Sequence, residues 1–322
     1  MGRSNGIGKL NLSTGNSVNG GPEVAVITRT WSPIRCWARA NPKTWVSIPP
    51  VLGAKQSLIW VIRTEPTVRH NGSTMRNLLF LHAHPDDEAL LTAGTMAKAH
   101  AAGHRVHLVV ATDGSAGLTS NQYSQDLASH RSMELAQSAQ ILGVTSVTEL
   151  KYPDSGLHGE NIPFGGFAGV DPQSVAGQLA DLMIEQGIDT LVGYDPSGGY
   201  GHPDHLHVHK VARAVRQMTA CTLFEATLPR EPIARAVKLA SAMSLTPSDF
   251  DPETFAHSWT PKAEITHRIN VRKFSSVKKA SIMAHSSQSS ADGTIRTLAV
   301  LSKLPKPIFD ALLGTEYFVK VN

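Results

Sequence analysis

The chain has 322 residues, 41% hydrophobic and 17% charged, which is typical of a soluble globular protein of one large or two smaller domains. No apolar run approaches the roughly 20 residues that a membrane helix needs. Two cysteines, Cys36 and Cys221, are too few for a disulfide framework and favour a reducing, cytoplasmic compartment.

The net charge of +4 is unevenly distributed along the chain. Residues 1–74 contain nine Lys or Arg but only two acids, a net of +7, which leaves −3 for residues 75–322. The larger part therefore carries no basic signature of nucleic-acid binding. Residues 1–74 also lack a helical or strand period, and we expect a poorly ordered extension outside the catalytic fold. A targeting segment or an over-long reading frame are the alternatives for its origin.

From Met75 onward, buried-strand patterns alternate with helical ones. The sequence predicts strands at 77–83, 104–112, 146–152, 189–195 and 221–228, and helices at 86–103, 124–143, 172–187 and 203–218. This alternation is typical of an α/β fold, a Rossmann-like, mostly parallel sheet flanked by helices. We divide 75–322 into a core at about 75–228 and a smaller C-terminal α+β portion at about 229–322. In that portion a helix at 273–286 and a strand at 315–321 are expected.

The tripeptide His-Pro-Asp occurs twice, in "LHAHPDDEALL" and in "GGYGHPDHLHVH", each time between a strand and a helix. In the strand order 3-2-1-4-5, the first and fourth strands are neighbours where the order reverses, and ligands bind there beyond the carboxyl ends of the strands. Proline suits a first helical turn, and acids are favoured near a helix start. We therefore expect six polar side chains to meet in one crevice: His84, Asp86, Asp87, His202, Asp204 and His205.

Histidines together with a carboxylate are ligands that Zn²⁺ binds while keeping one position open for water. Such a cation lowers the pKa of its water and polarises a carbonyl, a second carboxylate takes up a proton, and a further histidine delivers one. A single His-Pro-Asp is more often a capped helix start. Two of them, each extended by another acid or histidine, favour a metal site and metal-assisted hydrolysis.

The segments "AHPDDE" (83–88) and "YDPSGGYGHPDH" (194–205) resemble the PIG-L/LmbE-like de-N-acetylase family over about residues 75–322. This family includes glucosaminyl-phosphatidylinositol deacetylases and the mycothiol-pathway deacetylase and amidase. By position, the resemblance implies His84, Asp87 and His205 as metal ligands and Asp86 as the general base. Zn²⁺ is the expected cofactor, with Fe²⁺ as the alternative.

Further roles are implied by the same resemblance. His202 is the expected general acid or oxyanion partner, tuned by Asp204, and Tyr200 is expected near the developing oxyanion. Arg131 and Asp154 match positions associated with holding substrate. The implied reaction removes the N-acetyl group from an N-acetylglucosamine-type conjugate. The segments "MAHSSQ" (283–288) and "GTEYF" (314–318) also resemble the family but suggest no role.

The loop at 112–117, "TDGSAG", differs from the acidic loop of the mycothiol-type enzymes, so an inositol-containing substrate does not follow from the sequence. Two alternatives stay open. One is an amidase that cleaves a larger acyl group from a glucosaminide, and the other is a sugar-binding relative without activity. The expected partner is a small amino-sugar conjugate, without nucleic acid or a membrane span, and a homo-oligomer is left open.

Overall fold

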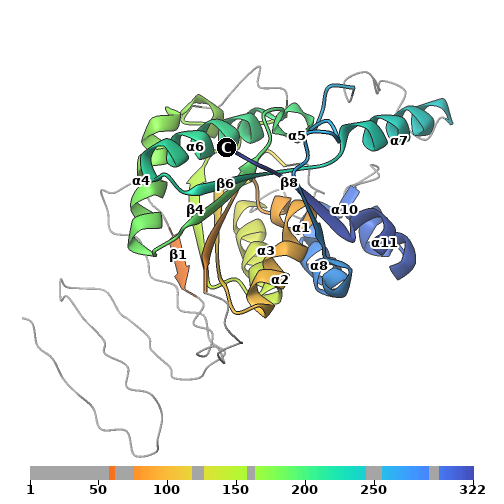
Figure 1. Ribbon diagram of the computed structural model, residues 1–322, viewed down its shortest axis with the longest axis horizontal. Helices are drawn as coiled ribbons and strands as arrows, with labels where there is room; N and C mark the ends of the chain where they lie inside the picture. Colours follow the sequence, from red (N-terminus) through yellow and green to blue (C-terminus); the bar gives the residue numbers. More distant parts are fainter. Residues whose placement is uncertain (1–57, 62–74, 118–126, 158–163, 244–255, 290–296) are drawn as a thin grey trace, which may run out of the picture. The chain divides into compact units, whose positions relative to one another are not determined.

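The computed structural model describes residues 58–61, 75–117, 127–157, 164–243, 256–289 and 297–322, all within one compact unit, Ser47–Asn322. Over these residues a single eight-stranded sheet has the order β1-β4-β3-β2-β5-β6-β8-β7 (Figure 1). The strands are β1 Leu58–Val61, β2 Asn77–His82, β3 Arg105–Thr112, β4 Ser146–Tyr152, β5 Thr190–Tyr194, β6 Thr222–Thr227, β7 His267–Asn270 and β8 Thr315–Lys320.

The five central strands are parallel. β2 pairs in parallel with both β3 and β5, β4 pairs in parallel with β3, and β6 pairs in parallel with β5. Across the sheet, β4-β3-β2-β5-β6 correspond to the predicted strands in the order 3-2-1-4-5, so the α/β class and the expected neighbours are confirmed. The two His-Pro-Asp segments follow β2 and β5, which lie side by side at the reversal of strand order.

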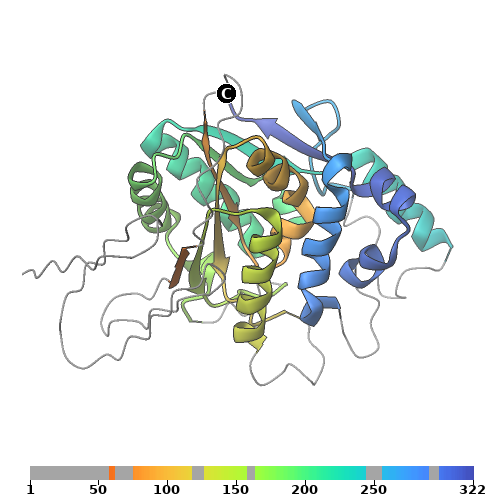
Figure 2. The same ribbon diagram turned by 90° about the horizontal axis from the view of Figure 1, so that it is seen from below.

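Helices cover both faces of the sheet (Figures 1 and 2). They are α1 Asp87–Leu91, α2 Ala93–Ala101, α3 Leu127–Leu142, α4 Pro172–Glu185, α5 Gly198–Gly201, α6 Pro203–Thr219, α7 Arg230–Ala242, α8 Ser275–Ala284, α9 Ser286–Ser289, α10 Thr297–Lys303 and α11 Lys306–Leu313, with 3-10 turns η2 Phe167–Gly169 and η4 Arg272–Phe274. In the described part of the chain no helix is both long and apolar enough to span a bilayer.

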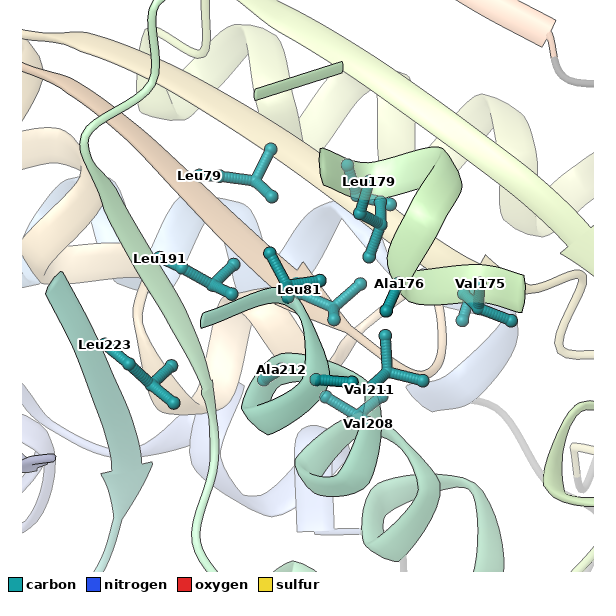
Figure 3. Close-up of a cluster of buried hydrophobic side chains, with 14 of the residues drawn as sticks. Leu79, Leu81, Val175, Ala176, Leu179, Leu191, Val208, Val211, Ala212 and Leu223 are labelled. Carbon is teal, nitrogen blue, oxygen red and sulfur yellow. The ribbon is translucent and has the colours of Figure 1, made fainter. Parts of the chain in front are cut away.

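Alternate side chains of the buried strands enter two different cores. Leu79 and Leu81 of β2 pack into the layer formed with α4 and α6, where Leu179 and Val211 lie (Figure 3). Phe80 faces the opposite way, into the layer formed with α2 and α3. Burying a Leu or Phe side chain fully stabilises the fold by about 2 kcal/mol. Because both faces of β2 are buried, apolar residues are favoured at every position, and the strand sequence is one continuous apolar run.

The predicted helix at 86–103 is divided in two at Thr92, whose φ of −135° is not helical. The Thr92 hydroxyl lies 2.8 Å from Nε2 of the buried His82 ring. A hydrogen bond to the preceding strand thus replaces helix continuity, which the apolar periodicity does not reveal.

Two other segments extend the predicted sheet, and the helix expected at 273–286 and the strand expected at 315–321 are observed as α8 and β8. Most of residues 1–74 lie outside the described residues, but Leu58–Val61 forms β1 and pairs antiparallel with β4, so this short part belongs to the sheet. Its β-favouring residues add a strand to an otherwise open edge. The C-terminal portion continues the same sheet through antiparallel β8 and β7, and it contributes α8, which packs beside α3 (Figure 2).

Candidate metal centre

The two His-Pro-Asp segments are built differently, although both lie just beyond a parallel strand. Pro203 occupies the first position of α6, as predicted, and the His202 ring caps this helix because its Nδ1 accepts from the Asp204 N–H at 3.2 Å. In the first segment α1 begins at Asp87, and the preceding Asp86 has φ 147° and ψ −22°. The side chains of both segments are brought to one place.

Three donor atoms form a nearly equilateral triangle. His84 Nδ1 lies 3.3 Å from Asp87 Oδ2, His205 Nε2 lies 3.3 Å from the same oxygen, and the two ring nitrogens are 3.2 Å apart. Ligands held about 2.0–2.1 Å from a tetrahedral Zn²⁺ lie roughly 3.3–3.4 Å from one another. The predicted ligands therefore fit one divalent cation of this size, with the fourth tetrahedral position left for water or substrate.

The outer nitrogens of both histidines already have acceptors. His205 Nδ1 lies 3.2 Å from the Gly198 carbonyl oxygen, and His84 Nε2 lies 3.2 Å from Asp204 Oδ2 and 3.6 Å from Asp154 Oδ1. A ring that donates from one nitrogen offers a lone pair on the other, which is how metal-binding histidines are usually oriented. Both rings thus turn their lone pairs toward the same point.

His202 belongs to two other groups of possible metal ligands whose ligand atoms lie within 4.8 Å of one another. One group is His84, His202 and His205, and the other is His84, Asp154, His202 and Asp204. We favour the Asp87 triangle, since all three of its sides match a tetrahedral edge. The His202 Nδ1 is also engaged by the Asp204 N–H.

The charges of the site call for a cation. Burial by itself would lower the pKa of His84, but hydrogen bonds to Asp154, Asp204 and Asp87 raise it well above the usual 6.5. Burial would likewise raise the pKa of Asp87, and the two neighbouring histidines, His205 and His84, lower it well below 3.8. The buried carboxylates around His84 thus favour a positive charge at this point, which a divalent ion would supply.

Asp86 is joined to a buried arginine. Arg131, 2% exposed, places Nη2 3.2 Å from Asp86 Oδ1 and donates to the Pro85 and Gly114 carbonyl oxygens at 2.8 and 2.7 Å. Burial raises the pKa of Asp86, and the guanidinium opposes this without reversing it. The raised pKa suits a carboxylate that takes up a proton.

The two residues expected to hold substrate, Arg131 and Asp154, are buried beside the metal-binding segments. Arg131 supports the Asp86 turn, and Asp154, 5% exposed, faces His84. The Asp204 carboxylate bonds to His84 and to the Ser155 N–H, and the Asp204 backbone N–H donates to His202. The charge of Asp204 also acts on His202, because it raises the pKa of that ring against the larger effect of burial.

His202 and Tyr200 complete the site as ring neighbours of the ligands. The His202 ring centroid lies 4.5 Å from that of His84, and the Tyr200 ring lies 5.2 Å from that of His205. Burial, followed by the charges of His84 and His205, lowers the pKa of His202 to about 4. Because His202 Nδ1 accepts a hydrogen bond, the proton of the neutral ring is on Nε2. At neutral pH this ring is an uncharged hydrogen-bond donor.

Several residues of this region were given no role from the sequence. Glu88 is fully buried and bonded to His285 of "MAHSSQ" at 2.6 Å. Tyr194 places its hydroxyl 2.9 Å from His82 Nδ1 and 3.2 Å from the Ala83 nitrogen. Trp259 packs over Gly199, so close that a Cβ there would lie 2.6 Å from the indole. The available signal was the resemblance to the family, since Glu88, Tyr194 and His285 lie in "AHPDDE", "YDPSGGYGHPDH" and "MAHSSQ".

The His, His, Asp triangle lies where the strand order of a mostly parallel α/β sheet reverses, beside a further carboxylate and a neutral histidine. This is the architecture of a metallohydrolase.

Comparison with known proteins gives the family. A family model described as "PIG-L: GlcNAc-PI de-N-acetylase" matches residues 79–216. The chain is 34% identical over 268 residues to a 1D-myo-inositol 2-acetamido-2-deoxy-alpha-D-glucopyranoside deacetylase of Acidothermus cellulolyticus, covering 76% of this chain and 88% of that relative. A protein of the same name from Mycobacteroides abscessus is 32% identical over 270 residues, covering 77% and 93%.

Among solved structures, an N,N'-diacetylchitobiose deacetylase from Pyrococcus horikoshii matches with a TM-score of 0.49 and 19% identity, covering 76% of this chain and 84% of that one. On the strength of the sequence relatives, the chain belongs to the PIG-L family of de-N-acetylases. The predicted family and the predicted class of enzyme, a hydrolase of an amide C–N bond, are confirmed.

Proposed function

We propose that this protein is a zinc-dependent de-N-acetylase that releases acetate from an N-acetylglucosamine conjugate and leaves a free amine. The observation that carries the proposal is the triangle of His84 Nδ1, Asp87 Oδ2 and His205 Nε2, with sides of 3.2–3.3 Å. The outer nitrogens of both histidines are already hydrogen-bonded, so the site is oriented before a cation arrives.

His84, Asp87 and His205 would hold the metal. A bound Zn²⁺ would supply a Lewis acid that lowers the pKa of water and polarises the amide carbonyl. Asp86, the remaining carboxylate of the first segment, accepts a proton from the attacking water. Its raised pKa makes it a better proton acceptor than an ordinary aspartate. The same carboxyl then gives this proton to the departing nitrogen, so that water and amide become acetate and amine.

His202 stabilises the negative charge that develops on the carbonyl oxygen. It does so as a neutral N–H donor, since its pKa near 4 leaves it uncharged at neutral pH. Tyr200, whose pKa is raised by burial and by nearby carboxylates, keeps its phenol proton and is available as a second donor. A single donor to such an oxyanion is typically worth about 10²–10³-fold in kcat. Of the two roles expected for His202, oxyanion partner is the one we propose.

The substrate class is approached through the relatives. The Acidothermus and Mycobacteroides proteins are named for a 2-acetamido-glucoside of myo-inositol. We propose this glucosaminide as the first substrate to test, with an N-acetylglucosaminide lacking inositol as the second. The inositol-free substrate is included because the loop "TDGSAG" lacks the acidic residues expected of mycothiol-type enzymes.

The test is a substrate panel with purified protein loaded with one equivalent of Zn²⁺ or Fe²⁺. Amine release is measured from the inositol glucosaminide, from a simple N-acetylglucosaminide, and from a glucosaminide bearing an acyl-cysteinyl group. We expect turnover of an acetylated substrate by the zinc form. Faster cleavage of the acyl-cysteinyl compound would identify an amidase instead, and no turnover of any amide would refute the proposal.

A further inference from the structure

The Asp86 backbone is strained. Its φ of 147° with ψ −22° lies outside the regions that a residue with a Cβ normally occupies. A conformation of this kind is unfavourable and persists only where surrounding groups impose it. The neighbouring Asp87 is an ordinary helical residue, so the strain is confined to the residue proposed as general base.

Two buried charged side chains hold the peptide group between Pro85 and Asp86 from opposite sides. Its carbonyl oxygen accepts from Arg131 Nη2 at 2.8 Å. Its N–H, on Asp86, donates to Glu88 Oε2 at 3.0 Å. A peptide group with both ends engaged cannot rotate without breaking one of the two charge-assisted bonds.

Glu88 is itself held by side chains from two other parts of the chain, Ser138 of α3 and His285. Its other oxygen, Oε1, lies 2.6 Å from His285 Nε2 and accepts from the Ser138 hydroxyl at 2.6 Å. Glu88 and His285 are both 0% exposed. His285 directly follows α8, so it comes from the C-terminal portion of the chain.

A buried ion pair of this kind is an expensive way to build a core. Its desolvation often cancels the attraction between the charges, and an apolar pair of the same size is commonly as stable or more stable. A requirement beyond packing therefore explains the pair, and across the turn the Glu88 side chain accepts from the strained Asp86 N–H.

We propose that Glu88 and His285 are positioning residues that hold the Asp86 turn in its strained conformation and so fix the direction of the general base. The proposal rests on the function proposed above for Asp86. His285 fixes Glu88, and Glu88 fixes the Asp86 N–H. By this route the C-terminal portion of the chain controls the catalytic turn that precedes α1.

The variants for the test are Glu88→Gln, Glu88→Ala and His285→Ala in the full-length, zinc-loaded protein. Gln retains an oxygen that can accept from Asp86, whereas Ala removes it. The matched control is Glu134→Gln. Glu134 is also a buried carboxylate, and it accepts from the Ser286 and Ser287 hydroxyls of the same C-terminal segment.

Kinetics and crystal structures are measured for each variant. A displacement of the base by about 1 Å costs on the order of 10²-fold, so we expect Glu88→Ala to lose about 100-fold in kcat. We expect its KM and its zinc stoichiometry to match the wild type. His285→Ala should lose less, Glu88→Gln should recover part of the rate, and Glu134→Gln should stay within about 2-fold of wild type. In the Glu88→Ala crystal structure, the φ of Asp86 should leave the positive range.

The proposal is overturned if Glu88→Ala keeps the wild-type φ at Asp86, or if its kcat equals that of the Glu134→Gln control. Loss of kcat together with loss of zinc would also count against it, because that pattern indicates general damage to the site. The crystal structures of the variants test whether Glu88 holds the Asp86 turn even if no turnover is measured. If the wild-type protein hydrolyses no amide, the proposed function fails, while the φ of Asp86 still shows whether Glu88 holds the turn.

Discussion

The strongest consequence of the site geometry concerns Asp204, because its carboxylate faces a metal ligand. Asp204 Oδ2 lies 3.2 Å from His84 Nε2, and the residue is 0% exposed. Replacing Asp204 by Asn keeps the shape but removes the charge that strengthens this hydrogen bond. Loss of such a partner behind a zinc-binding histidine typically weakens metal binding by about 10–100-fold, or about 1.4–2.8 kcal/mol.

We expect Asp204→Asn to weaken zinc binding by an amount near the lower end of that range, since Asp154 Oδ1 remains 3.6 Å from the same nitrogen. In the double variant Asp154→Asn/Asp204→Asn, the loss of zinc affinity should reach the upper end. The dissociation constant for zinc is measured by competition with a chromophoric chelator. Glu225→Gln serves as the control, because this buried carboxylate bonds to Arg213. Zinc affinity of Asp204→Asn within 2-fold of the control would refute the assigned orientation of His84.

Three further outcomes are expected. Asp86→Asn should keep its zinc but lose about 10²–10⁴-fold in kcat, the usual contribution of a general base, and activity within 10-fold of wild type would contradict this role. Burial lowers the pKa of His107 from 6.5 to about 4. The unfolded chain therefore takes up this proton first as the pH falls, and stability is lost between pH 6.5 and 4. Urea titrations should show the wild type losing about 2 kcal/mol more than His107→Phe between pH 7 and 5, and equal losses would disprove the shift. Lys278→Met should cost about 3 kcal/mol in urea unfolding, since it leaves the buried Glu316 without its 2.6 Å partner. Lys278→Met/Glu316→Gln should recover part of this loss, and a single variant as stable as wild type would argue against the pair.

Much of the fold was predictable because the strands and helices of the core have clear hydrophobic periods. The strand at 146–152 coincides with β4, and Pro203 begins α6 as expected. The break at Thr92 was not predictable, since it depends on a hydrogen bond to His82 across the helix–strand junction. The β1 strand was also missed, because four residues in an aperiodic segment carry too little pattern.

The site was predictable where one short segment carries the chemistry. His84 and Asp87 are three residues apart at one helix start, so the sequence alone places them together. Glu88 and His285 are 197 positions apart, and no local pattern indicates that a buried charge pair will join them. The place of Arg131 behind Asp86 likewise follows from the packing of α3, which depends on tertiary contacts rather than on spacing.

The most direct test of the account is a crystal structure of the zinc-loaded protein with anomalous scattering measured at the zinc edge. We expect one zinc ion held by His84 Nδ1, an Asp87 carboxylate oxygen and His205 Nε2, each about 2.0–2.2 Å away. A zinc ion bound through His202 in place of Asp87, or none at this position, would contradict the account.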